Sequence, residues 1–382
     1  MRRYRARFRP WAFRYDPGTG DGADRLTSPG GRRGLPGGRG FLSAEIWRVN
    51  EAPRFLGEAD IRRLAIAPDE ARRAVTEIFR AASEDRAVRA PKTALALSPG
   101  HGFQAMAAAS ASAGLAVVKW TGIATVPPGG EGPGINSLII VSDYETGKPM
   151  AVLDGNEITL IRTAALSAVA GSYLAPAGAQ TLGMIGCGLQ AHQHLAALCT
   201  LRPDLDRLLA FSRSEASAAR LVEAAEARGL AGEVVSSPQD LLERADIVVS
   251  MVPASPELMP FLDARVLKRD CFVSAVDLGR AWLPESFAAF DLLATDDLAQ
   301  GTHPWDVNGR EVDTAEFTTD LLAMCRETAP QEATSPETRG RRLFCFKGSS
   351  LADLALSALV VERAWPGIIA SDARITEVSN RT

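Results

Sequence analysis

The chain has 382 residues, enough for two domains with separate hydrophobic cores. Its formal net charge of −4 gives no indication of a nucleic-acid partner. No apolar run approaches the ~20 residues needed to cross a bilayer, so no membrane partner is predicted either. Its five cysteines are scattered, with no C-x-x-C pair, which predicts reduced thiols and a cytoplasmic location.

The first segment, residues 1–40, is rich in Arg, Gly and Pro and has no apolar period. Such a composition cannot bury enough surface to offset the entropy of ordering, so we predict a disordered extension. Three explanations stay open for it: a nucleic-acid-binding tail, a transit peptide, or a start codon assigned too far upstream. Ordered structure is expected from about residue 41.

Residues 41–176 are predicted to form an α+β domain. "APDEARRAVTEIFRAAS" has helical spacing and a proline near its start. "GLAVVKW" predicts a strand, and "SLIIVS" and "PMAVLD" predict an antiparallel hairpin around the turn "DYETGK". The small-residue stretch "EITLIRTAALSAVAGSYLA" predicts a helix that ends before Pro176.

Strands and helices alternate from residue 177 to residue 334. The strands are expected at "TLGMIG", "RLLAFS", "EVVSS", "DIVVSMV", "CFVSAVD" and "DLLATD". This alternation predicts a Rossmann domain with a doubly wound parallel sheet, so the fold class is α/β. The last segment, residues 335–382, contains the amphipathic helix "LADLALSALVVERAW", which we expect to pack on the first domain and complete it.

The stretch "TLGMIGCGLQAHQH" contains Gly186, Gly188 and Ala191 in a G-x-G-x-x-A spacing between a predicted strand and a predicted helix. In that setting the glycines permit a tight turn and a close approach to a pyrophosphate, which the helix N-terminus then binds. We therefore assign Gly186, Gly188 and Leu189 to a dinucleotide, a ligand-free turn being the alternative. His192 and His194 lie two apart on this helix, so they are expected to be exposed or capping residues, and no metal site is predicted.

The end of the second strand indicates which dinucleotide binds. An acidic residue there would bind the ribose hydroxyl of NAD, whereas a basic residue suits a 2′-phosphate. The chain has Ser212, Arg213 and Ser214 at this position, and an arginine can bind a phosphate through two hydrogen bonds. NADP(H) is therefore favoured, with NAD(H) as the possible alternative.

Several stretches together resemble the ornithine cyclodeaminase/mu-crystallin family, from about residue 41 to the end of the chain. They are "VVKW", "ETGKPMAVLDGNEITLIRTAALSAVAGSYLA", "GMIGCGLQAHQHLAAL", "VSAVDLGR" and, more weakly, "FCFKGSSLADLA". The resemblance implies a Rossmann domain, a second domain that forms a homodimer through sheets building a shared barrel, and NAD(P)-dependent chemistry at the α-carbon of a small amino acid or a cyclic imine.

The resemblance also assigns roles to single residues. Arg162, a long cation on an apolar helix, corresponds to the residue that binds the substrate carboxylate. Lys119 corresponds to a residue that exchanges protons with the substrate, and Asp277, at the carboxyl end of a strand, to the acid/base at the amine. Lys92 corresponds to a second carboxylate contact. Two further positions correspond to cofactor contacts: Thr163 and Gln190.

The stretch "DLGR" departs from the D-x-P-G-K that is common in cyclodeaminases, which places ornithine in doubt as the substrate. We therefore predict an amino acid dehydrogenase or a ketimine reductase. The alternatives are a true ornithine cyclodeaminase, which forms proline and ammonia, and a crystallin-like protein that binds NADP(H) without turnover. Three residues are candidates for the side-chain pocket, although core packing explains them equally well: Met106, Trp120 and Trp282.

Overall fold

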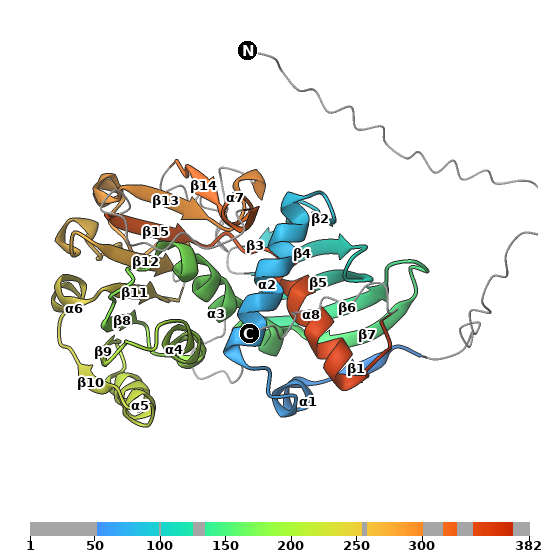
Figure 1. The fold of residues 1–382 in the computed structure, drawn as a ribbon, viewed down its shortest axis with the longest axis horizontal. Coiled ribbons are helices and arrows are strands. Elements are labelled where there is room, and N and C mark those ends of the chain that lie inside the picture. The colour runs from blue at the N-terminus through green and yellow to red at the C-terminus, as the bar shows by residue number, and fades with distance from the viewer. Residues whose placement is uncertain are drawn as a thin grey trace, which may run out of the picture. The chain divides into compact units, whose positions relative to one another are not determined.

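The computed structural model of the chain describes residues 52–98, 101–124, 134–253, 258–300, 316–326 and 339–369. The predicted extension over residues 1–40 lies outside these residues. The described chain folds into two sheets with helices packed on them (Figure 1). No helix within these ranges is long and apolar enough to cross a membrane.

The first sheet has seven strands in the order β1-β7-β6-β5-β4-β2, with β3 paired to β4. β1 runs parallel to β7 and the other pairs are antiparallel, so the predicted hairpin is confirmed as β6 and β7. The strand bounds are β1 Arg54–Leu56, β2 Ala87–Arg89, β3 Thr93–Ser98, β4 His101–Ser110, β5 Leu115–Ala124, β6 Ile135–Asp143 and β7 Pro149–Asp154.

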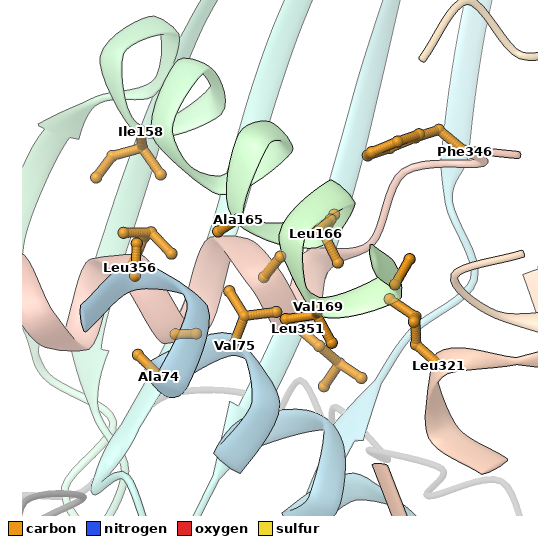
Figure 2. Packing of buried hydrophobic residues seen from close by; sticks show 14 of the residues in the cluster. Ala74, Val75, Ile158, Ala165, Leu166, Val169, Leu321, Phe346, Leu351 and Leu356 are labelled. Carbon is orange, nitrogen blue, oxygen red and sulfur yellow. The ribbon is translucent and has the colours of Figure 1, made fainter. Parts of the chain in front are cut away.

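Helices cover one face of this sheet. They are α1 (Glu58–Arg63), α2 (Pro68–Ser83), α3 (Gly155–Leu174) and α8 (Ser350–Ala364). Figure 2 shows Val75 of α2, Val169 of α3 and Leu351 of α8 meeting in one apolar cluster. The predicted return of the C-terminal helix to the first domain is therefore confirmed. Asp154 caps α3 by accepting a hydrogen bond from the Glu157 N–H at 2.7 Å.

The second sheet is parallel throughout and has the order β10-β9-β8-β11-β12-β15-β13-β14. This order confirms the predicted Rossmann sheet. Its strands are β8 Thr181–Ile185, β9 Arg207–Phe211, β10 Ala231–Val234, β11 Ile247–Ser250, β12 Cys271–Ala275, β13 Leu292–Thr295, β14 Thr319–Asp320 and β15 Arg341–Cys345. Around it lie α4 Leu189–Leu201, α5 Glu215–Glu226, α6 Pro238–Arg244, α7 Leu321–Arg326, and the 3-10 turns η1 Ala264–Val266, η2 Pro284–Ala289 and η3 Leu298–Gln300.

One predicted boundary is wrong. Residues 335–382 were assigned to the first domain, but β15 lies in the second sheet between β12 and β13. The sequence of a short strand does not indicate which sheet the strand joins, so the five residues "RRLFC" could not reveal this placement. The chain returns to the first domain only with α8.

The face of the first sheet that the helices do not cover is rich in exposed apolar side chains. Strand register puts Trp120 opposite Ala105 and Leu138, while the neighbouring Lys119 points to the helix side, opposite Met106 and Ile139. We call this surface the outer face; its largest exposed members are Phe55, Val88, Leu95, Phe103, Trp120, Leu138 and Ile140. Trp120 stacks on Phe103 there, so it does not line a pocket on the helix side.

Candidate active site

The loop between β8 and α4 has the shape that a bound pyrophosphate requires. Gly186 has a φ of +90°, and a Cβ there would lie 2.6 Å from the Met251 carbonyl oxygen. Nothing lies within 4 Å of the position that a Cβ on Gly188 would take, and this residue caps α4 without a side chain. The first N–H groups of α4, at Leu189 and Gln190, therefore have no side-chain cap, as in helix starts that bind anions.

The strand next to this loop ends at the residues that were predicted to select the cofactor. β9 pairs with β8, and the Gly186 N–H donates to the Phe211 carbonyl at 2.9 Å. Ser214 caps α5 by accepting from the Ser217 N–H, and Ser212 accepts weakly from the Ser214 N–H. Arg213 is exposed and makes no hydrogen bond or ion pair within the described ranges. The structure thus brings the predicted cofactor residues to one edge of the sheet.

Three buried charges from three elements meet on the helix-covered face of the first sheet. Asp353 of α8 accepts a hydrogen bond from Lys119 of β5 at 2.8 Å, and the same oxygen lies 3.3 Å from Arg162 Nε of α3. All three residues are less than a tenth exposed. Burial lowers the pKa of Lys119 to about 8, an effect that Asp353 opposes and Arg162 strengthens. Two residues that were predicted separately for the site, Lys119 and Arg162, are therefore brought together by a carboxylate.

Lys92 belongs to a neighbouring group of charges. Its ammonium donates to the Lys347 carbonyl at 2.7 Å, and burial lowers its pKa, with Asp296 acting in the opposite direction. Asp296, which follows β13, accepts from the Gly348 N–H at 2.6 Å, and burial raises its pKa. The charge of Arg162 acts on both Lys92 and Asp296, so this group adjoins the first one.

Asp277 follows β12 in a tight turn and is buried. It accepts from the Gly279 N–H at 3.1 Å, from the Val252 N–H at 3.4 Å and from the Ser250 hydroxyl. Burial raises its pKa to about 6 in spite of these bonds. Leu278 has a φ of +62°, a conformation that costs a non-glycine residue energy and is concentrated at functional sites.

The Cys345 thiol places Asp277 at the same edge of the sheet as Asp296. Both carboxylates act on the Cys345 thiol at the end of β15, whose pKa burial raises to about 12. Trp282 donates to Ser250 Oγ at 3.0 Å and is buried, so it supports the Asp277 turn. Met106 is also buried, and its methyl group lies 3.8 Å from where a Cβ on Gly348 would be.

Thr163 lies on α3, and Gln190 and His194 lie on α4, the helix that follows the glycine loop. Thr163 donates to the Thr159 carbonyl at 2.6 Å within α3, and Gln190 Oε1 is a buried acceptor with no partner among the described residues. His194 is fully buried, and not exposed or capping as predicted, because it joins α4 to α3. Its Nδ1 lies 2.7 Å from the Gln190 carbonyl, which can only accept, so Nδ1 carries the proton and Nε2 accepts from Ser167 at 2.8 Å.

Sequence reasoning missed three residues of this region: Asp296, Lys347 and Asp353. The signal for Asp353 was present, because an aspartate inside the apolar helix "LADLALSALVV" needs a cation as much as Arg162 needs an anion. Asp296 and Lys347 gave no such signal, since both sit at ends of strands where charged residues are common.

A parallel sheet whose strand β8 leads through a glycine turn into helix α4 defines the Rossmann class of dinucleotide-binding folds. Residues 53–282 match the ornithine cyclodeaminase/mu-crystallin family, and the chain belongs to this family. The predicted resemblance is thereby confirmed.

Individual relatives agree with this placement. Alanine dehydrogenase from Archaeoglobus fulgidus is 28% identical over 303 residues, which cover 78% of this chain and 91% of the relative. Delta(1)-pyrroline-2-carboxylate reductase from Bacillus cereus is 32% identical over 152 residues, or 40% of this chain and 45% of the relative. The solved structure of an archaeal alanine dehydrogenase dimer with bound NAD superposes with a TM-score of 0.71 at 25% identity, covering 82% of this chain and 96% of the other.

Proposed function

We propose that the protein is an NAD(P)-dependent oxidoreductase that transfers a hydride to or from the α-carbon of a small amino acid or its imine. One observation carries the proposal: Arg162 is nearly buried, yet its two terminal guanidinium nitrogens make no hydrogen bond within the described ranges. A nearly buried guanidinium that is paired with Asp353 only through Nε leaves its two terminal nitrogens for a carboxylate ligand. Relatives named alanine dehydrogenase and pyrroline-2-carboxylate reductase act on carboxylates of this kind.

The residues around Arg162 supply the remaining requirements of the reaction. The cofactor, when bound along the glycine loop, donates or accepts the hydride. Lys119, whose pKa is about 8, can give up or take a proton near neutral pH. Asp277, whose pKa is about 6, can do the same at the substrate nitrogen. Lys92 adds positive charge for the carboxylate.

The cofactor is NAD or NADP, and we propose that NADP(H) is preferred. Exposed Arg213 lies beside the hydroxyls of Ser212 and Ser214 at the tip of β9, where a 2′-phosphate would lie. Wild-type protein should bind NADP(H) about 10- to 100-fold more tightly than NAD(H), and Arg213→Ala should remove most of that difference.

Fluorescence titration of both reduced cofactors measures this preference. Arg207→Ala is a suitable control, because Arg207 is an exposed arginine at the opposite end of the same strand. It should leave the ratio of the two affinities unchanged. Equal affinities in the wild-type protein would show that Arg213 does not select the cofactor.

We also propose that the protein is a homodimer joined through the outer face of the first sheet. That face spans all seven strands of the first sheet and presents large apolar side chains to water, which is unusual for a monomer. A second copy offers the same apolar surface, and a two-fold interface is self-complementary by nature. The structural relative with bound NAD is itself described as a dimer.

Trp120→Asp should convert the protein to a monomer, because it places a charge at the centre of the outer face. Light scattering at micromolar concentration measures the mass. Val234→Asp, which alters an exposed apolar residue of the second sheet, should leave the dimer intact. A monomeric wild-type protein would contradict the proposal.

The location is proposed to be cytoplasmic. The five cysteines are free thiols, four of them buried, as is usual in a reducing compartment.

A further inference from the structure

Asp353 holds together two residues that come from other parts of the fold. It lies in the first turn of α8 and is completely buried. Its Oδ1 accepts from the Lys119 ammonium at 2.8 Å and lies 3.3 Å from Arg162 Nε. β5, α3 and α8 are far apart in the sequence, so this single oxygen joins two candidate site residues from separate elements, one by a hydrogen bond and one by an ion pair.

The cluster is not fully satisfied by its own members. Asp353 Oδ2 and Arg162 Nε are both buried, and neither has a hydrogen-bond partner among the described residues. Leaving buried polar atoms unpaired is costly, and a carboxylate in an apolar helix is costlier still unless cations face it. A purely structural role would be served better by apolar side chains. The arrangement instead suits a site whose charges must be held in one geometry.

We propose that Asp353 is the positioning residue of the active site: it orients the Arg162 guanidinium toward the substrate carboxylate and holds the Lys119 ammonium in place. This inference rests on the proposed function for its catalytic consequence. Its structural part does not, because the contacts among the three residues exist without substrate.

The proposal has a consequence for the charge of Lys119. The charged groups that face its ammonium are Asp353 on α8, Arg162 on α3 and Lys92 before β3. Asp353 favours the protonated amine, whereas the two cations and burial favour the neutral amine. Removing the charge of Asp353 should therefore lower the pKa of Lys119, and removing the charge of Arg162 should raise it.

The small number of lysines in the chain makes the pKa of Lys119 measurable. It has only five lysines, at positions 92, 119, 148, 268 and 347. Protein labelled with 13C-lysine should give five ε-carbon signals, which Lys→Arg variants at 148 and 268 and Lys119→Met help to assign. The signal of Lys119 should titrate with a midpoint near pH 8 in the wild-type protein.

Asp353→Asn keeps the size of the side chain and removes its charge. We expect the midpoint of the Lys119 titration to fall by ~1 pH unit or more. The part of the pH profile of kcat/KM that depends on the protonation of Lys119 should move to lower pH by the same amount. Ser357→Ala is the matched control: Ser357 lies one turn further along α8, and its buried hydroxyl has no partner in the described residues. It should change neither the midpoint nor the profile.

An unchanged Lys119 midpoint in folded Asp353→Asn would overturn the proposal. If that variant does not fold, Arg162→Gln tests the same geometry with the opposite sign, and a midpoint that fails to rise would overturn it. A shifted midpoint in a protein that turns over no amino acid or imine would support the positioning role and count against the proposed function. The two failures are therefore distinguishable.

Discussion

Asp277→Asn should lower kcat by about 10²–10⁴ while cofactor binding stays unchanged. Asparagine keeps the shape of the side chain, and its single carbonyl oxygen can still accept one of the two hydrogen bonds that Asp277 Oδ1 and Oδ2 take from the Gly279 and Val252 N–H groups. It cannot take or give a proton at the substrate nitrogen. Because proton transfer occurs in the transition state, the loss should appear in kcat and leave KM nearly unaltered.

The pH profile adds a second, independent sign of this role. In the oxidative direction the carboxylate form of Asp277 is the active one, so the rate should rise as the pH increases through about 6. That limb should disappear in Asp277→Asn. Asp204→Asn, which alters an exposed loop carboxylate, should keep both rate and limb. A near-normal kcat in Asp277→Asn would show that another group moves the proton.

Arg162→Ala should raise KM by about 10²–10³ and change kcat much less. A carboxylate clamp acts in the ground state and in the transition state alike, so its loss weakens binding in both. The magnitude corresponds to ~3–4 kcal/mol, which is typical of a buried charge-assisted contact. Steady-state kinetics on the best substrate provides the measurement.

Arg162→Lys separates charge from geometry. Lysine keeps the positive charge beside Asp353 but offers no planar fork, so we expect only part of the affinity to return. A variant at position 162 that binds substrate as well as the wild-type protein would rule out the clamp. Circular dichroism should first show that both variants fold, because Arg162 is a buried residue of α3.

The parts of the site that depend on a short stretch of sequence could be predicted. Gly186 and Gly188 lie within one turn, and the strand and helix beside them supply their own periodic signals. Arg162 was visible because a cation stands out on an apolar helix. The antiparallel hairpin of β6 and β7 was visible because its turn residues separate two apolar runs.

The parts that depend on contacts distant in sequence could not be predicted in the same way. Asp353 and Lys119 form a hydrogen bond although they are 234 positions apart in the sequence, and the residues next to either one do not indicate its partner. β15 pairs with β12 in the second sheet, although many residues separate the two strands in the sequence. Trp120 was a candidate for the pocket because strand direction alone does not say which face is covered; α2, α3 and α8 decide this, and they leave Trp120 outside.

The central claim is redox chemistry at the α-carbon of an amino acid or imine, and one measurement tests it most directly. The purified protein is presented with a panel of small amino acids and cyclic imines, and NAD(P)H absorbance and ammonia are followed together. The account predicts that at least one compound changes the reduced cofactor in stoichiometric proportion to product, and that Asp277→Asn abolishes this change. Release of ammonia from ornithine without any net change in NAD(P)H, or cofactor binding without turnover of any compound, would contradict it.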